Sequence, residues 1–180
     1  MFGYKNAQLK NVRSRISCLI ESPGLYGNMS AYDNLAVKCR LFGINDKRYI
    51  ENILKTVGLS NVGKKKTKHF SLGMKQRLGI GMALVGEPDL LLLDEHTAAL
   101  DPKTADKVLQ ITEEIVARDN LTTLMVTHNM KNAIQYGNRL IMMDAGHVVV
   151  DIRGEEKKNL TVRDLLEKFN IESDRMLLSE

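Results

Sequence analysis

The chain has 180 residues, 43% of them hydrophobic and 27% charged, which is ordinary for a soluble globular protein that buries one core. Its two cysteines, Cys18 and Cys39, form neither a disulfide framework nor a metal-binding spacing, so we expect reduced thiols and a cytosolic protein. The most apolar region, residues 78–95, is interrupted by Glu-Pro-Asp and therefore excludes a membrane span.

The net charge of +4 is unevenly distributed along the chain. Residues 1–80 contain 15 Lys and Arg against 4 Asp and Glu, whereas residues 81–180 contain 11 against 18. A basic half can indicate nucleic acid, but these basic residues lack interleaved aromatic residues, so no nucleic-acid partner is expected. A solvated surface, or a face that meets an acidic partner or a nucleotide, accounts for the same charge.

The first half predicts one strand followed by helices. Residues 15–20 are typical of a short buried strand, and the turn-rich residues 21–30 predict a loop. Ser30 is a candidate N-cap for a helix closed by Gly43. Apolar residues at helical spacing predict a second helix over residues 46–59, and a third is expected from about Lys75.

The second half alternates strands with helices, which indicates an α/β fold with a largely parallel sheet. The continuous apolar run at 89–95 is typical of a central parallel strand buried on both faces. The further expected elements are a helix over 101–120 with Asp101 near its start, a buried strand over 121–128, a short helix over 129–138, two strands within 139–152, and a helix over 161–169 capped by Thr161. Residues 30–85 are then a helical subdomain inserted in the sheet, and residues 171–180 a C-terminal tail.

Polar residues follow two of the predicted parallel strands. Asp94 and Glu95 end one of them, at the edge where open α/β sheets bind ligands. Asp94 is suited to holding Mg²⁺ through water, and Glu95 to orienting or deprotonating a water molecule. His128 ends the next strand and should emerge at the same edge. Alternatively, Asp94 and Glu95 only mark the end of a strand that meets solvent, and His128 has a structural role.

The stretch Ser71-Leu72-Gly73 precedes a predicted helix. A serine hydroxyl and backbone N–H groups at a helix N-terminus form an anion-binding site. A simple helix cap explains the same residues, and the fragment alone favours that interpretation.

Taken in order, these motifs resemble the ATP-binding subunit of ABC transporters across residues 1–170. The order is a loop that contains glutamate (IESPGLYGNMS), a helical insert, FSLGMKQRL, LLLLDE, TAALDP and MVTH. The resemblance implies a P-loop NTPase-like core with an inserted helical subdomain, and ATP with Mg²⁺ as cofactors.

The resemblance also assigns roles to residues of the predicted nucleotide site. Ser71, Gly73 and Gln76 fall in the signature motif, which grips the γ-phosphate of an ATP held by the partner subunit. Asp94 matches the Walker B carboxylate near Mg²⁺, and Glu95 matches the catalytic base.

Three further segments match family motifs other than the signature and Walker B motifs. Asp101 lies in the D-loop with Ala99 and Leu100, and His128 matches the switch histidine that contacts the γ-phosphate. Glu21 stands where the Q-loop glutamine is usual, and keeps a metal-facing oxygen while adding a charge.

Several residues depart from the usual motifs. Leu72 replaces a glycine and Met74 a glutamine, in a form similar to bacitracin- or lantibiotic-type export ATPases. His96 stands where proline is usual, and the segment from there to residue 130 resembles putative tryptophan- or tyrosine-type importers. The front half thus resembles exporters and the back half importers, as in a hybrid joined near LLLLDE.

The Walker A loop of the family is missing from this sequence, because residues 1–11 resemble the stretch that lies between that loop and the Q-loop. We therefore expect an N-terminally truncated domain that is inactive alone and whose uncovered sheet favours association. Residues Gly58-Leu-Ser-Asn-Val-Gly-Lys64 nearly fit a P-loop, but they follow a helix, so Gly58 is expected to end that helix and the lysines to be solvated.

Two functions remain open from the sequence. The first is an ATP-hydrolysing subunit that works with separate membrane subunits and a second nucleotide-binding subunit, at the cytoplasmic face of the membrane and without inserting into it. The alternative is a non-catalytic fragment or partner that contributes only a signature motif.

Overall fold

A computed structural model describes residues 12–177, and the side chains of residues 12–171. The chain divides into two compact units, one that ends at Val126 and one that begins at Thr127. None of the described helices is long and apolar enough to cross a bilayer. Residues 1–11, on which the expected start of the domain depends, lie outside the described residues.

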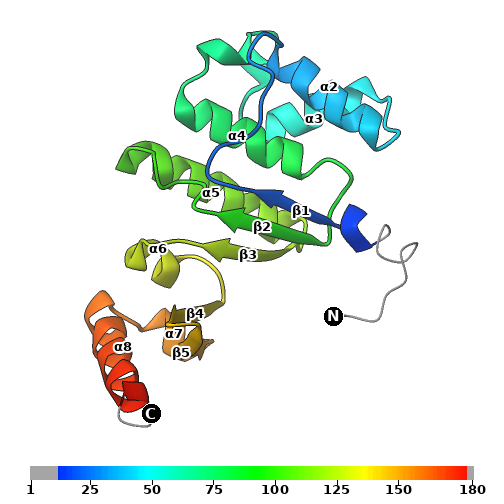
Figure 1. Cartoon of the computed structure of the whole chain (residues 1–180). Coiled ribbons are helices and arrows are strands. Elements are labelled where there is room, and N and C mark those ends of the chain that lie inside the picture. Colours follow the sequence, from blue (N-terminus) through cyan, green and yellow to red (C-terminus); the bar gives the residue numbers. More distant parts are fainter. Residues whose placement is uncertain (1–11, 178–180) are drawn as a thin grey trace. The chain divides into compact units, whose positions relative to one another are not determined.

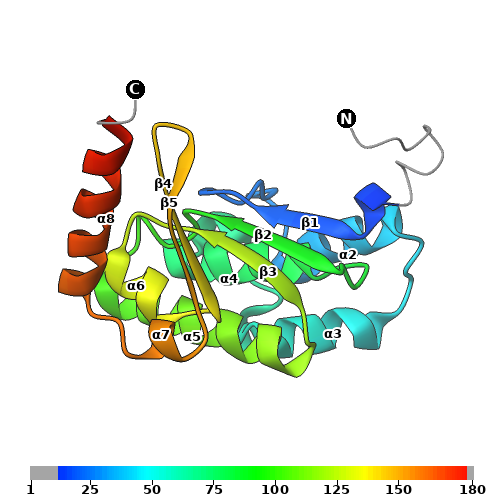
Figure 2. The same ribbon diagram turned by 90° about the horizontal axis from the view of Figure 1, so that it is seen from below.

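The first unit is built on a three-stranded parallel sheet. Its strands lie side by side in the order β1 (Ile16–Leu19), β2 (Leu90–Asp94) and β3 (Thr122–Val126) (Figures 1 and 2). The register pairs Leu19 with Leu93, and Leu93 with Met125, so the three strands end at one edge of the sheet. The predicted central position of β2 is confirmed.

Helices α2, α3, α4 and α5 accompany this sheet, and α2, α3 and α4 group together on the side of β1 (Figure 1). Their bounds are Ala31–Leu41 for α2, Lys47–Thr56 for α3, Leu72–Ala83 for α4 and Pro102–Arg118 for α5. Two short 3₁₀ turns, η1 (Ser60–Val62) and η2 (Thr67–His69), connect α3 to α4. The expected helices are confirmed, but α4 begins at Leu72 rather than at about Lys75.

Polar caps determine where these helices begin and end. The Ser30 hydroxyl accepts from the Asp33 N–H, and the Asp33 carboxylate accepts from Ser30 in return, which forms a capping box. Gly43 and Gly58 follow α2 and α3 with φ of +73° and +66°, a conformation that glycine adopts at little cost. The expectation that Gly58 ends a helix is therefore confirmed, and Lys64–Lys66 are exposed as expected.

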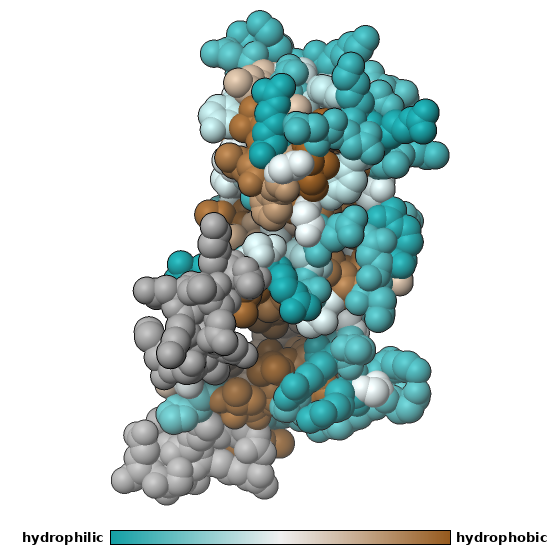
Figure 3. All heavy atoms as spheres, turned by 90° about the vertical axis from the view of Figure 1, so that its right-hand side faces the viewer, coloured by the Kyte–Doolittle hydropathy of each residue, from teal (hydrophilic) through white to brown (hydrophobic). Residues whose placement is uncertain are grey.

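Within the described part of the chain, one face of the sheet is fully covered and the other is partly exposed. Leu19, Leu91 and Leu93 are buried in a core that includes Leu78 of α4 and Ile115 of α5. On the opposite face Ile16 is 40% exposed, Leu124 55% and Val126 48%. Figure 3 shows one side of the molecule, on which hydrophobic residues reach the surface among hydrophilic ones. The predictions that β1 and β3 are buried, and that β2 is buried on both faces, were therefore wrong, because an apolar run does not reveal whether both faces are covered.

The second unit contains a hairpin and three helices. Strands β4 (Arg139–Asp144) and β5 (His147–Arg153) pair antiparallel through Ala145-Gly146, both with positive φ, as expected for a tight hairpin. The helices are α6 (Met130–Gln135), α7 (Glu155–Lys158) and α8 (Val162–Leu177). Thr161 and Asp164 form the expected cap of α8, which continues through residues 171–177, where a tail was expected.

Gly79 of α4 should be intolerant of a larger side chain. A Cβ atom there would lie 2.8 Å from Leu19 Cδ1 and 2.8 Å from Pro23 Cβ. We expect Gly79→Val to lower the free energy of unfolding by about 1–3 kcal/mol, measured by urea denaturation. Gly24→Val is the control, because nothing lies within 4 Å of its Cβ position, and an equal loss in both variants would contradict the packing argument.

The uncovered sheet face should drive self-association of the isolated chain. Replacing Leu124 and Val126 with threonine places a β-branched strand residue at both positions and removes exposed apolar surface. We expect the double variant to shift the chain toward monomer in sedimentation velocity experiments. A wild-type chain that is already monodisperse would contradict this expectation.

Candidate nucleotide site

The candidate site begins at the end of β2. Asp94 is exposed at the C-terminal end of the strand, and Glu95 follows with φ of +49°. This left-handed backbone is uncommon for a residue with a side chain. It lets the Glu95 N–H donate to the Val126 carbonyl (3.2 Å) while the Glu95 carbonyl accepts from the Ala98 N–H (3.0 Å). The carboxylate pair is therefore fixed against the end of β3, and backbone outliers of this kind cluster at functional sites.

His96, the next residue, is almost completely buried, with 1% of its surface exposed. Burial lowers the pKa of its imidazole to about 4, so the side chain is neutral at physiological pH. Its Nε2 atom has no hydrogen-bond partner among the described residues. The sequence marked His96 only as a departure from proline, and nothing in the local pattern indicated that it would be buried.

The signature residues lie at the start of α4. Ser71 is the N-cap, and its hydroxyl accepts from the Met74 N–H at 3.3 Å. The first N–H groups of a helix lack intrahelical acceptors, so those of Leu72 and Gly73 are available to an anion. The cap and the anion site, which the sequence presented as alternatives, are thus compatible in this geometry.

Gly73 brings the start of α4 against the start of α5. A Cβ atom on Gly73 would lie 2.3 Å from Thr104 Cγ2, so this close approach requires glycine. Asp101 is the N-cap of α5, and hydrogen bonds from Thr104 hold the pKa of its carboxyl below the usual value. Thr104 therefore contacts both predicted motifs. Sequence reasoning missed it, although its place three residues after Asp101 is typical of a cap.

Gln76 joins α4 to the chain that follows β1. Its side chain is 2% exposed, and its Nε2 atom donates to the Glu21 carbonyl oxygen at 2.5 Å. The Glu21 side chain is exposed. Gln76 thus contacts the backbone of the predicted Q-loop residue and does not lie at the surface where a nucleotide would bind.

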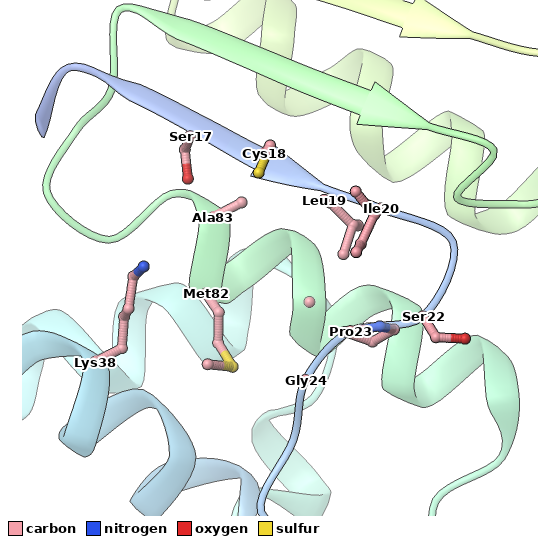
Figure 4. Close-up of a pocket in the computed structure, with 11 residues that line it drawn as sticks. Ser17, Cys18, Leu19, Ile20, Ser22, Pro23, Gly24, Lys38, Met82 and Ala83 are labelled. Atoms are coloured by element: carbon pink, nitrogen blue, oxygen red, sulfur yellow. The ribbon is translucent and has the colours of Figure 1, made fainter. Parts of the chain in front are cut away.

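A pocket lies beside these residues, between β1, the following loop, α2 and α4 (Figure 4). Ala83 of α4 points toward β1, whereas Met82 points away from β1 on the side of α2, from which Lys38 extends. The described lining includes none of the predicted site residues, so this pocket is separate from the candidate nucleotide site.

The structure places seven of the eight predicted residues in the first unit and His128 in the second. Contacts join Gln76 to Glu21, and Gly73 to the Asp101 cap through Thr104. The Glu95 backbone is bound to Val126. His128 is exposed and follows Val126 by two residues along the chain.

Comparison with known proteins identifies the family. The model of the family described as "ABC transporter" matches residues 3–98, just over half of the chain. The chain belongs to the ABC transporter family. The predicted family and α/β ABC fold are therefore confirmed.

Among curated relatives, the tyrosine transport ATP-binding protein of Clostridioides difficile (strain R20291) is 55% identical over 104 residues, which are 58% of this chain and 41% of that protein. The bacitracin transport ATP-binding protein BcrA of Bacillus licheniformis is 32% identical over 171 residues, 95% of this chain and 56% of the relative. The lantibiotic transport ATP-binding protein SrtF of Streptococcus pyogenes is 34% identical over 146 residues, 81% and 63% respectively.

This ABC chain thus spans about half the length of the curated relatives that it matches. Both of the branches that the sequence suggested, tyrosine transport and bacitracin or lantibiotic transport, appear among the relatives. The division into an exporter-like front half and an importer-like back half stays a prediction.

The contact between Gln76 and Glu21 predicts a specific loss of stability. In Gln76→Glu a carboxylate replaces the amide donor opposite the Glu21 carbonyl, in a buried position. We expect a loss of about 1–3 kcal/mol in urea denaturation, with faster hydrogen exchange in residues 20–24.

Gln110→Glu provides the matched control, because Gln110 lies on the exposed side of α5. It should leave both the free energy of unfolding and the exchange of residues 20–24 unchanged. Equal effects of the two substitutions would show that Gln76 does not hold this loop.

Proposed function

We propose that this chain is part of the ATP-binding and ATP-hydrolysing subunit of an ABC transporter, which couples hydrolysis to transport by separate membrane subunits. The observation that carries the proposal is the Asp94-Glu95 pair at the end of the central parallel strand, with Glu95 in a left-handed conformation bound to Val126. Ligands bind at this edge of open α/β sheets.

The carboxylate pair suits magnesium nucleotide chemistry. Within residues 12–171 no group of three or more His, Cys, Asp or Glu residues could form a protein-only metal cage. Mg²⁺ needs none, because it commonly binds through one or two carboxylates, retained waters and phosphate oxygens. Asp94 would hold Mg²⁺ through water, and Glu95 would orient and deprotonate the attacking water. A bound Mg²⁺ ion would neutralise part of the negative charge of the phosphates.

The signature residues would act on the nucleotide of a second nucleotide-binding subunit. Ser71 and the first N–H groups of α4 would contact its γ-phosphate, in a position that Gly73 and Gln76 set through α5 and the loop after β1. Asp101 would lie at the interface between the two subunits. Ser71 is exposed and Gln76 is buried, which supports a contact role for Ser71 and a positioning role for Gln76.

The remaining predicted residues follow the other two strands. His128 would contact the γ-phosphate, and Glu21 would present its exposed carboxylate toward the metal. We place the assembled subunit at the cytoplasmic face of the membrane, against its membrane subunits. The matched relatives are named for transport of tyrosine, bacitracin and lantibiotic, so the proposal concerns the ATP-driven step and names no cargo.

A second candidate function is a partner that contributes a signature motif without hydrolysing ATP itself. The observation that favours it is the contrast between two motifs. The α4 N-terminus is well formed, whereas the P-loop-like residues 58–64 form the turn after α3 and the 3₁₀ turn η1. In this case Ser71 would be required for function and Glu95 would not.

Substitutions at Ser71 and Glu95 separate the two candidates. The full chain is mixed with an intact ABC ATP-binding subunit, and ATP turnover is measured. We expect turnover to rise, and Ser71→Asp to abolish the rise, because aspartate keeps the helix cap but repels phosphate. Under the first proposal, Glu95→Gln lowers the stimulated rate by about a hundredfold or more; under the second, the rate is unchanged.

Ser71→Asn is the matched control, since asparagine caps α4 equally well and carries no charge. Its unfolding midpoint should match that of Ser71→Asp, so that a difference in turnover reports on phosphate contact. If the wild-type chain neither stimulates turnover nor binds labelled ATP, both candidates are contradicted.

A further inference from the structure

His96 is the buried residue of the loop that joins β2 to α5. The structure describes every residue of this loop, 95–101, and the other six are exposed or half-buried, whereas His96 is 1% exposed. The loop carries Glu95 at its start and Asp101 at its end. The imidazole is therefore the side chain that anchors this loop in the interior.

Two backbone hydrogen bonds fold the loop into consecutive turns. The Glu95 carbonyl accepts from the Ala98 N–H at 3.0 Å, and the Thr97 carbonyl accepts from the Leu100 N–H at 3.1 Å. His96 is the second residue of the first turn. Unlike proline, histidine does not fix its own φ, so this turn needs a restraint from elsewhere, and the buried imidazole supplies one.

Glu95 has a backbone conformation that depends on such a restraint. Its φ is +49°, and its N–H donates to the Val126 carbonyl at 3.2 Å. A left-handed conformation in a residue other than glycine persists only where the surrounding structure holds it. The bond to Val126 holds Glu95 on one side, and the turn anchored by His96 holds it on the other.

The His96 imidazole also needs a hydrogen-bond partner from outside the described side chains. Its Nε2 atom has none among the described residues, and neither does the buried Oε1 atom of Gln76. Gln76 binds the carbonyl of Glu21, just after β1, and His96 lies just after β2, so both belong to the edge where these paired strands end. Nearly all buried polar atoms in folded proteins bind protein groups or ordered water.

We propose that His96 is a positioning residue for Glu95, held in place by a buried water molecule bound to its Nε2 atom. The water fixes the ring, the ring anchors the turn, and the turn holds Glu95 against the end of β3. A neutral imidazole has one donor and one acceptor nitrogen, and water can bind either. The consequence for catalysis rests on the proposed ATPase function, whereas the anchor itself needs no nucleotide.

A purely apolar anchor is the simpler alternative. If His96 only fills space, its Nε2 atom gains nothing from a polar partner, and leucine, which is close to histidine in size, would hold the turn equally well. Glutamine is also close in size and places an amide oxygen or nitrogen near the Nε2 position. The substitutions His96→Leu and His96→Gln therefore separate a hydrated anchor from an apolar one.

Amide hydrogen exchange of the full chain, resolved to single residues and measured without nucleotide, tests the anchor. In His96→Leu we expect the Glu95 and Ala98 N–H groups to exchange about tenfold faster or more, and in His96→Gln at nearly the wild-type rate. The N–H groups of Val108 and Ile115, in the buried part of α5, should keep their wild-type rates in both variants.

Three results of this measurement would overturn the proposal. Wild-type rates at Glu95 and Ala98 in His96→Leu would show that the polar atom is not needed. Equal acceleration in His96→Gln and His96→Leu would show the same. Equal acceleration along α5 would show a general loss of stability. His147→Leu is the matched control, because it makes the same chemical change at an exposed position and should leave the Glu95 and Ala98 rates unchanged.

The water molecule can be detected directly by NMR. We expect a nuclear Overhauser effect between a long-lived water and the ring protons of His96, and none at the exposed ring of His147. Its absence at His96 would overturn the hydrated anchor.

ATP turnover tests the consequence for Glu95, in a mixture with an intact subunit in which Glu95→Gln lowers the rate. We expect His96→Leu to lower kcat about tenfold or more with KM for ATP unchanged, because the position of a general base affects the chemical step and not nucleotide binding. His96→Gln should recover most of kcat. Full turnover by His96→Leu would overturn the positioning role. A wild-type chain that supports no turnover, while the exchange results hold, would contradict the ATPase proposal and leave the anchor supported.

Discussion

The packing of α4 against the end of β1 and the start of α5 is the constraint on which the candidate nucleotide site depends. Gly73, Gln76 and Gly79 recur every three residues, so they lie along one side of the helix. The first meets Thr104, the second binds the Glu21 carbonyl, and the third meets Leu19 and Pro23. A side chain added at either glycine would push the signature serine away from the other motifs.

This packing connects the signature motif to the carboxylate pair through the sheet. The loop held by Gln76 follows β1, and β1 is paired with β2, whose end carries Asp94 and Glu95. The left-handed backbone of Glu95 then binds the end of β3. Displacement of α4 would therefore reach Glu95 through the loop after β1 and the pairing of β1 with β2, and could alter the position of the Glu95 carboxylate.

Much of the first unit could be predicted from local patterns. Ser30 and Thr161 cap helices as the sequence indicated, because capping depends on residues within one turn. The start of α4 was missed because Gly73 disfavours a helix, and only its contact with Thr104, thirty-one positions away, explains why it is helical. The exposure of Leu124 was missed for a similar reason, since coverage of a strand depends on distant parts of the chain.

Two departures from the usual motifs, Glu21 and Leu72, fall where this packing does not involve the altered side chain. Met74, a third, is partly buried and packs against the core of the first unit. Glu21 contributes its backbone carbonyl to Gln76, so exchanging glutamine for glutamate at this position leaves the contact intact. Leu72 is 39% exposed, whereas the neighbouring Gly73 is buried. His96 differs because it is buried and its Nε2 atom lacks a partner in the described part of the chain. His96 is therefore the departure that brings a polar group into the interior, next to Glu95 in the sequence.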